Sequence, residues 1–213
     1  FVNSAGERFM NESLPYDQAG RAVIAAHQSG VSHLPFWLVF DNRFGDEMPA
    51  MSTAPMAARQ EYVDAGLWRT ADSLDELATA IDVPAGALQA TVARFNGFAA
   101  SGVDEDHHRG EAPYDLFFAF GGGDPNPALV PIENGPFHAV QFAVSDLGTK
   151  GGLVTDTSAR VLRADGSVIP GVYAAGNTMA PWSRDTYPAP GTPIGTCMVF
   201  SYLAVLDMQD RAR

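Results

Sequence analysis

The chain has 213 residues, 46% of them hydrophobic and 18% charged, which is typical of a globular protein with a buried core. The formal net charge of -12 would repel phosphate backbones, so nucleic acid is not an expected partner. One cysteine excludes an internal disulfide and favours a cytoplasmic location, and no apolar run approaches the roughly 20 residues that span a bilayer.

The first 40 residues predict extended segments on either side of a helix. Residues 1–9 alternate around Gly6, as expected for a strand, a turn and a second strand. Because this opening reads like the interior of a domain, we expect the chain to be a fragment of a longer polypeptide. Residues 17–28 are Ala-rich with helical spacing, and the short apolar run 36–40 favours a buried strand.

Two helices with clear start signals come next. Ser73 is a candidate N-cap, and Glu76 completes a capping box with it. Pro84 is expected to begin the second helix. His107 and His108 follow in an acidic loop that could bind a metal, but neighbouring histidines in such a loop are more often solvated. We therefore predict no metal site.

The second half alternates short extended segments with glycine-rich connections. Residues 121–135 predict an irregular connection. Extended segments are expected at 137–144, 159–162, 168–169 and 171–176, the middle two forming a hairpin. The apolar stretch 194–206 is long enough for a buried helix, in which Cys197 would be a packed thiol.

The segment of residues 187–195, Tyr-Pro-Ala-Pro-Gly-Thr-Pro-Ile-Gly, is the most informative for chemistry. Glycine allows another molecule to approach the backbone closely, and proline stiffens the loop. The helix start that follows presents unpaired N–H groups, which suit a carbonyl oxygen or the electron-rich edge of a flavin. A rigid loop that only caps a core helix fits the same pattern, and spacing alone favours that plainer interpretation.

Tyr16 follows a proline in the sequence Asn-Glu-Ser-Leu-Pro-Tyr. A phenol can donate or accept a proton, although it needs help to act as a base at neutral pH. A buried structural tyrosine is the more common case, and these residues alone do not decide between the two roles.

Motifs along the whole chain resemble the flavoprotein family that contains fumarate reductases and ketosteroid dehydrogenases. Residues 1–13 resemble its VNxxGxRFxNE motif. Gly-Gly-Leu-Val-Thr-Asp at 151–156 and Ile-Pro-Gly-Val-Tyr-Ala-Ala-Gly-Asn at 169–177 resemble the return of that family into its FAD domain.

Narrower motifs are similar to those of 3-ketosteroid Δ1-dehydrogenases, namely residues 146–152 and 186–195. Fumarate reductases carry a histidine before the paired glycines and an arginine in the later loop. Here the first region has no histidine, and Tyr187 stands near the place of that arginine. A phenol and a backbone N–H suit a ketone better than a dicarboxylate, which requires cations.

The resemblance implies roles for individual residues. The Tyr187 hydroxyl and the Gly191 N–H would bind the C3 carbonyl oxygen of a 3-ketosteroid, and Tyr16 would take the C2 proton while a hydride leaves C1 for the flavin. Gly176 and Asn177 would lie near the ribityl chain of FAD. Thr192, Pro193 and Ile194 would lie at the pyrimidine edge of the flavin, although Pro193 has no N–H to donate.

The resemblance also implies the organisation and the partners. It predicts an α+β fold, with a substrate-capping catalytic domain at 1–150 and the C-terminal part of an interrupted FAD-binding domain at 151–213. The chain contains no G-x-G-x-x-G motif, so the N-terminal nucleotide-binding half is an expected partner. A quinone-like electron acceptor and a cytoplasmic location, or one peripheral to the membrane, are implied as well.

Two alternatives to Δ1-dehydrogenation stay open on the sequence. A Δ4-(5α) ketosteroid dehydrogenase would use the same cofactor at C4–C5. A cofactor-free module that binds hydrophobic ligands without catalysis would fit the missing nucleotide-binding motif.

Overall fold

The computed structural model describes residues 1–44, 59–117, 119, 123–146 and 148–213. These residues form two compact units, Phe1–Val144 and Ser145–Arg213, which we describe separately. Among the described helices, none combines the length and the apolar character needed to cross a membrane.

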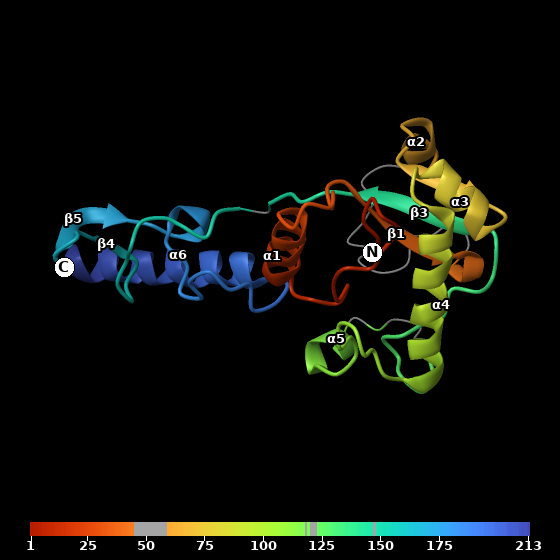
Figure 1. Cartoon of the computed structure of the whole chain (residues 1–213). Coiled ribbons are helices and arrows are strands. Elements are labelled where there is room, and N and C mark those ends of the chain that lie inside the picture. The colour runs from red at the N-terminus through yellow and green to blue at the C-terminus, as the bar shows by residue number, and fades with distance from the viewer. Residues whose placement is uncertain (45–58, 118, 120–122, 147) are drawn as a thin grey trace. The chain divides into compact units, whose positions relative to one another are not determined.

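The first unit is built on a three-stranded antiparallel sheet (Figure 1). The central strand β3 (Phe137–Phe142) pairs with β1 (Phe36–Asp41) on one side and β2 (Trp68–Ala71) on the other. Val140 lies opposite Leu38 of β1 and Trp68 of β2. The predicted strands 36–40 and 137–144 are thus confirmed, whereas residues 1–9 form only isolated bridges from Val2 to Arg8 and Trp37.

Helices α3 (Leu74–Ala80) and α4 (Ala85–Ser101) begin at the residues that the sequence indicates. The Ser73 side chain accepts a hydrogen bond from the Glu76 N–H at 3.3 Å, which satisfies a donor at the start of α3. Pro84 is the N-cap of α4. The two helices pack on the sheet through a common core, which includes Val2, Val39, Leu77, Ala78, Ile81, Val83, Leu88, Val92 and Ala139.

The remaining elements of the first unit are short. Helix α1 (Tyr16–His27) buries Val23 against Met10 and Phe36 of β1, as its helical spacing predicted. The others are η1 (Asn42–Phe44), α2 (Arg59–Asp64) and α5 (Pro113–Phe117).

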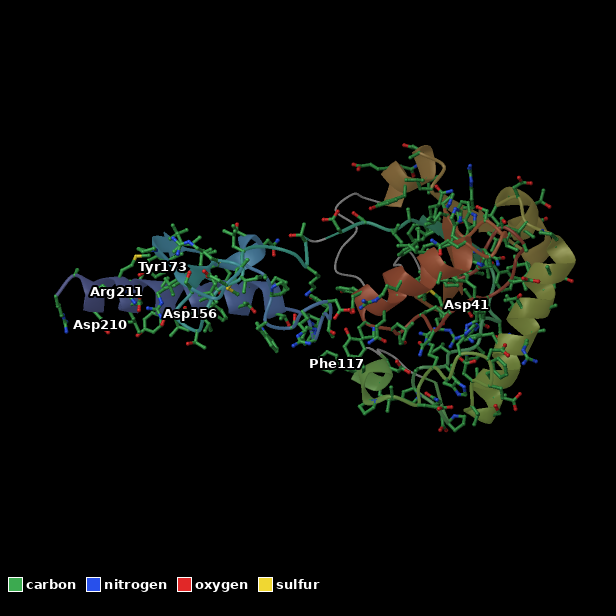
Figure 2. All side chains as sticks on the ribbon, turned by 60° about the vertical axis from the view of Figure 1, so that its left-hand side comes forward. Asp41, Phe117, Asp156, Tyr173, Asp210 and Arg211 are labelled. Atoms are coloured by element: carbon green, nitrogen blue, oxygen red, sulfur yellow. The ribbon has the colours of Figure 1, made fainter. Side chains whose placement is uncertain are left out.

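The second unit consists of one hairpin and one long helix. Strands β4 (Arg160–Leu162) and β5 (Val168–Tyr173) form the predicted antiparallel hairpin. The extended segments expected separately at 168–169 and 171–176 are one strand here, because β5 continues from Val168 to Tyr173 and η2 (Gly176–Thr178) follows. In Figure 2, Tyr173 and Asp156 lie where the hairpin meets α6 (Thr192–Arg211); Tyr173 donates to Asp207 Oδ2 at 2.7 Å.

The predicted burial of the long helix is wrong for this structure. Within α6, Ala204 is the buried residue, while Ile194, Met198 and Tyr202 are each about two-thirds exposed. The reason is that the small core of this unit, made by Val161, Ala174 and Met179 with Ile169 and Phe200, covers only one side of the helix. Cys197, expected to be packed, is likewise exposed.

Candidate functional site

Three segments of the second unit meet around a small pocket of about 40 Å³. They are the glycine-flanked stretch at 149–150, the turn and loop at 176–183, and the start of α6. Four predicted cofactor-site residues line this pocket together, namely Gly176, Asn177, Thr192 and Pro193. Residues that lie far apart in the sequence therefore converge where the sequence analysis places the flavin.

Close backbone approach at this pocket depends on glycine. Gly148 has φ of 140°, and a Cβ atom there would lie 2.3 Å from Asn177 Nδ2. Gly152 has φ of 149°, and its Cβ would lie 2.6 Å from the carbonyl carbon of Met179. Since a side chain at either position would collide with its neighbour, the spacing of the motif at 146–152 has a steric cause.

A buried polar atom at the same pocket lacks a partner. Ser183 lines the pocket, and within the described part of the chain its buried Oγ makes no hydrogen bond. By contrast, Trp182 Nε1 donates to Thr196 Oγ1 at 3.0 Å. A buried hydroxyl without a partner carries a desolvation cost, which a polar ligand in the pocket would offset.

The start of α6 presents the predicted backbone donors. Gly191 is the N-cap, with φ of 85°, and the Gly195 N–H donates to its carbonyl at 2.9 Å. The Thr192 N–H and hydroxyl both donate to the Ala189 carbonyl, at 3.2 and 2.6 Å. The hydrogen bonds of the described residues include none from the N–H groups of Gly191 and Ile194, so these donors are available to a ligand at the helix start.

The two predicted catalytic tyrosines belong to different units. Tyr187 is half-buried in the loop before α6, where the Lys150 ammonium lies 5.5 Å from its ring centroid. Tyr16 is the first residue of α1 and is half-buried, directly after the N-cap Pro15. Asp17, the next residue, has one carboxylate oxygen bonded to Arg21, while the other is buried with no hydrogen-bond partner among the described residues.

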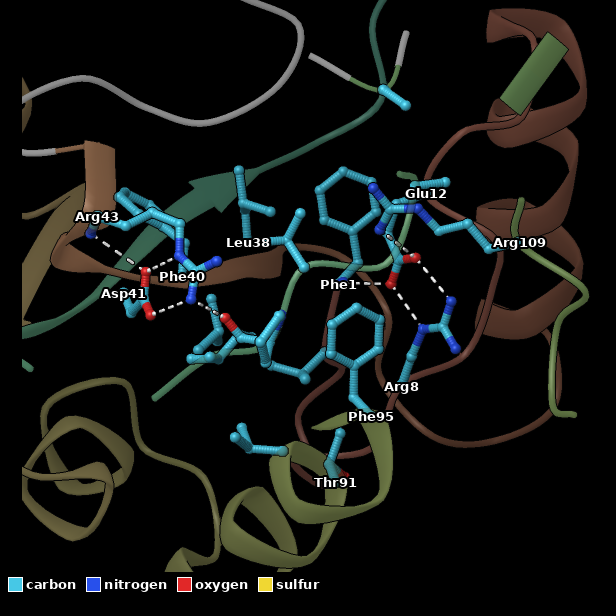
Figure 3. Close-up of a pocket in the computed structure, with 18 of the residues that line it drawn as sticks. Phe1, Arg8, Glu12, Leu38, Phe40, Asp41, Arg43, Thr91, Phe95 and Arg109 are labelled. Atoms are coloured by element: carbon cyan, nitrogen blue, oxygen red, sulfur yellow. Dashed lines mark hydrogen bonds and ion pairs between the residues drawn. The ribbon is translucent and has the colours of Figure 1, made fainter. Parts of the chain in front are cut away.

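The first unit contains a separate, larger pocket of about 140 Å³ that the sequence analysis missed (Figure 3). Its walls are mostly apolar, and a charged cluster lies at one end. Glu12 accepts from Arg8 at 2.9 and 2.8 Å and from Arg109 at 3.1 Å. Arg8 also donates to the buried Asp104 at 2.8 and 2.7 Å. Because these charges already pair with one another, the cluster fits a structural role better than ligand binding.

Two buried carboxylates of this unit, Asp104 and Asp41, have lowered pKa values. Burial alone would raise the pKa of Asp104, but Arg8 and the backbone N–H groups of Arg109 and His107 outweigh burial and lower it. Asp41, which also lines the pocket, behaves in the same way. Burial opposes its ionisation, while backbone N–H donors and Arg43 lower its pKa.

Lys150 and Ser183 are the site residues that sequence reasoning missed. The signal for Lys150 was present, because it is the only lysine in a chain with 12 arginines and it stands between glycines. No comparable signal marks Ser183, whose importance depends on its burial in the folded unit.

Comparison with known proteins places the chain among flavoproteins. Residues 1–194 match the FAD binding domain family. The chain is 45% identical over 216 residues to 3-oxosteroid 1-dehydrogenase of Mycobacterium tuberculosis strain H37Rv, covering 99% of this chain and 38% of that protein. It is 38% identical to 4-oxocyclohexanecarboxylate 2-dehydrogenase of Sinomonas cyclohexanicum, covering 95% of this chain and 35% of that protein.

A solved structure matches the fold. The 3-ketosteroid Δ1-dehydrogenase of Sterolibacterium denitrificans, in complex with 1,4-androstadiene-3,17-dione, superposes with a TM-score of 0.83 at 34% identity. That match covers 97% of this chain and 37% of the other. The mixed helix and sheet architecture is therefore that of the ketosteroid dehydrogenases, and the chain spans less than two-fifths of the length of the relatives it matches. The chain belongs to the FAD binding domain family of flavoproteins.

Proposed function

We propose that the chain contributes the carbonyl-binding and proton-accepting residues of an FAD-dependent 3-ketosteroid Δ1-dehydrogenase. The observation that carries the proposal is the 45% identity along 99% of the chain to a 3-oxosteroid 1-dehydrogenase. The pocket of the second unit supports it, because it gathers the predicted flavin-site residues beside the Tyr187 loop.

The residues of this pocket fit a flavin. An isoalloxazine ring needs flat backbone surfaces nearby and hydrogen-bond donors at its oxygen-rich edge. The pocket supplies glycine at 176 and the buried Ser183 hydroxyl, which has no partner among the described residues. Ile194 does not line the pocket, but its N–H follows the pocket residue Pro193 at the start of α6. When bound, FAD would supply a hydride acceptor next to C1 of the steroid.

In this proposal the protein acts on the carbonyl and on the C2 proton. The Tyr187 hydroxyl and the Gly191 N–H donate to the C3 carbonyl oxygen and stabilise the negative charge that develops there. Polarisation of the carbonyl acidifies the neighbouring C2–H, and Tyr16 accepts that proton. Loss of the C2 proton and of the C1 hydride leaves the C1–C2 double bond.

The organisation of the whole enzyme is part of the proposal. We assign residues 1–150 to a substrate-capping domain and residues 151–213 to the FAD-binding domain. The nucleotide-binding half would supply the site for the ADP part of FAD. A quinone-like molecule would accept the electrons, and the location would be cytoplasmic or peripheral to the membrane.

A second substrate class is favoured by one comparison. The relative from Sinomonas cyclohexanicum is named for dehydrogenation of a 4-oxocyclohexanecarboxylate, at 38% identity. A six-membered cyclic ketone is common to both names, and the carbonyl-binding donors proposed here would serve either ring system. Product analysis with both substrates separates the two and also reveals any Δ4-(5α) activity.

Tyrosine variants test the proposal directly. Tyr187→Phe removes one donor to the developing oxyanion, and we expect kcat to fall about 10²- to 10³-fold. Tyr16→Phe removes the proton acceptor, and kcat should fall by about 10²-fold or more. Tyr202→Phe is the matched control, because its ring is exposed on α6. Wild-type kcat in both Tyr16→Phe and Tyr187→Phe would refute the assigned roles.

A further inference from the structure

Lys150 contacts two consecutive residues of the loop that carries the proposed oxyanion donors. Its Nζ donates a hydrogen bond to the Thr186 carbonyl at 3.0 Å. The same Nζ lies 5.5 Å from the centroid of the Tyr187 ring, within the range of a cation–π interaction. Lys150 also lines the small pocket together with Gly176 and Asn177.

The backbone around Lys150 is held in place on the opposite side. The backbone at Gly148 leaves no room for a Cβ beside the Asn177 side chain, and Thr149 Oγ1 lies 3.5 Å from the Asn177 carbonyl oxygen. Beyond Gly151 and Gly152, the Leu153 N–H donates to the Thr178 carbonyl at 2.9 Å. Lys150 therefore projects toward the loop from a segment that is fixed against the turn at 176–178.

Tyr187 requires such a restraint. Prolines at 181, 188 and 190 limit the backbone φ angles of the loop, but they do not set the side-chain torsions of Tyr187. An oxyanion donor is effective only when its hydroxyl is held within hydrogen-bond distance of the developing charge before reaction. A cation over the ring face and a hydrogen bond to the preceding carbonyl restrict the ring and the backbone together.

We propose that Lys150 is a positioning residue that orients Tyr187 toward the substrate carbonyl. This inference depends on the proposed function, since it assigns Lys150 to the same site. Arginine can reproduce both the positive charge and the hydrogen bond, whereas methionine keeps only the apolar stem. In this proposal the ammonium group of Lys150, rather than the volume of its side chain, orients Tyr187.

Kinetics of three variants test the inference. For Lys150→Met we expect kcat to fall about tenfold with KM little changed, because orientation of the donor is needed in the transition state. Lys150→Arg should restore most of kcat. Arg184→Met, which removes an exposed positive charge from the same loop, should behave like the wild type. The inference would be overturned if Lys150→Met kept the wild-type kcat. It would also be overturned if kcat fell as far in Lys150→Arg as in Lys150→Met.

A spectroscopic measurement tests the contact without turnover. Protein labelled with [ε-¹³C]lysine gives an Hε signal that is assigned by its loss in Lys150→Arg. The ring current of Tyr187 should shift this signal upfield, and Tyr187→Leu should abolish the shift while Tyr187→Phe keeps it. If the chemical shift of the Lys150 Hε signal is the same in Tyr187→Leu as in the wild type, the inference is overturned. If the contact is present but the enzyme turns over no ketosteroid, the proposed function has failed instead.

Discussion

Replacing Asp104 by Asn should destabilise the first unit strongly. Asp104 is fully buried and accepts two hydrogen bonds from Arg8, at 2.8 and 2.7 Å. It also accepts backbone N–H bonds from Asp106 and His107 at 3.2 Å and from Arg109 at 3.1 Å. Asparagine keeps one acceptor oxygen but directs an NH₂ group at these donors and removes the charge that compensates Arg8.

The size of the effect follows from the burial. Breaking a buried ion pair by removing one partner costs about 3–5 kcal/mol of unfolding free energy. Arg8 keeps its bonds to Glu12, so we expect a value near the lower limit, about 3 kcal/mol. For a protein of this size that loss lowers the Tm by about 10 °C. Thermal unfolding followed by circular dichroism and urea unfolding both measure it.

Asp106→Asn is the matched control. Asp106 makes a similar bidentate pair with Arg94, at 2.7 and 2.6 Å, but the two side chains are 32% and 57% exposed. Because water screens an exposed pair, its loss should shift the Tm far less than Asp104→Asn. Equal shifts in the two variants, or no shift in Asp104→Asn, would refute the claim that the buried cluster stabilises this unit.

Three further predictions follow from the site and its surroundings. Because folding lowers the pKa of Asp104 and Asp41, their stabilisation is present above the unfolded value of about 4 and is lost as pH falls through the folded pKa. Acid unfolding should therefore begin below about pH 4 and be less steep in Asp104→Asn. Gly152→Ala should destabilise the second unit by about 2 kcal/mol or more, since its Cβ meets backbone atoms, and FAD binding should be lost. Ser183→Ala should weaken FAD binding about 3- to 10-fold while leaving the cofactor-free protein equally or more stable.

Matched measurements decide each of these predictions. Gly151→Ala is the control for Gly152→Ala, because a Cβ at 151 meets no atom within 4 Å. Comparable Tm values for the two variants would contradict the steric argument. Ser183→Ala is tested by fluorescence titration with FAD, and unchanged affinity would exclude its hydroxyl from the cofactor site. Acid unfolding curves that coincide for the wild type and Asp104→Asn would show that this carboxylate does not control the transition.

Local signals in the sequence predict the secondary structure well where the cause is itself local. Ser73 and Pro84 cap their helices through contacts within a few residues, so their roles can be read without a fold. The hairpin around residues 163–166 is similarly local. Burial of the long apolar helix depends instead on what packs against it, and α6 leaves Met198 and Tyr202 exposed in this structure.

In the candidate site, too, the features with local causes could be predicted from the sequence, and those that depend on distant residues could not. Glycines and prolines marked the segments of the site, and the resemblance to ketosteroid dehydrogenases supplied residue roles that remain to be tested by mutation. The contact of Lys150 with Tyr187 joins residues 37 positions apart, and the orphaned hydroxyl of Ser183 is visible only once the pocket has formed. Pairings across such distances have no periodic signature in the sequence.

The most direct test of the central claim is the visible spectrum of the purified protein with FAD, before and after anaerobic addition of 4-androstene-3,17-dione. If the protein belongs to a 3-ketosteroid Δ1-dehydrogenase, the steroid should bleach the flavin absorbance and appear as 1,4-androstadiene-3,17-dione, and Tyr187→Phe should slow the bleaching. Bound FAD that keeps its full absorbance with the steroid, with no diene formed, would contradict the proposed function.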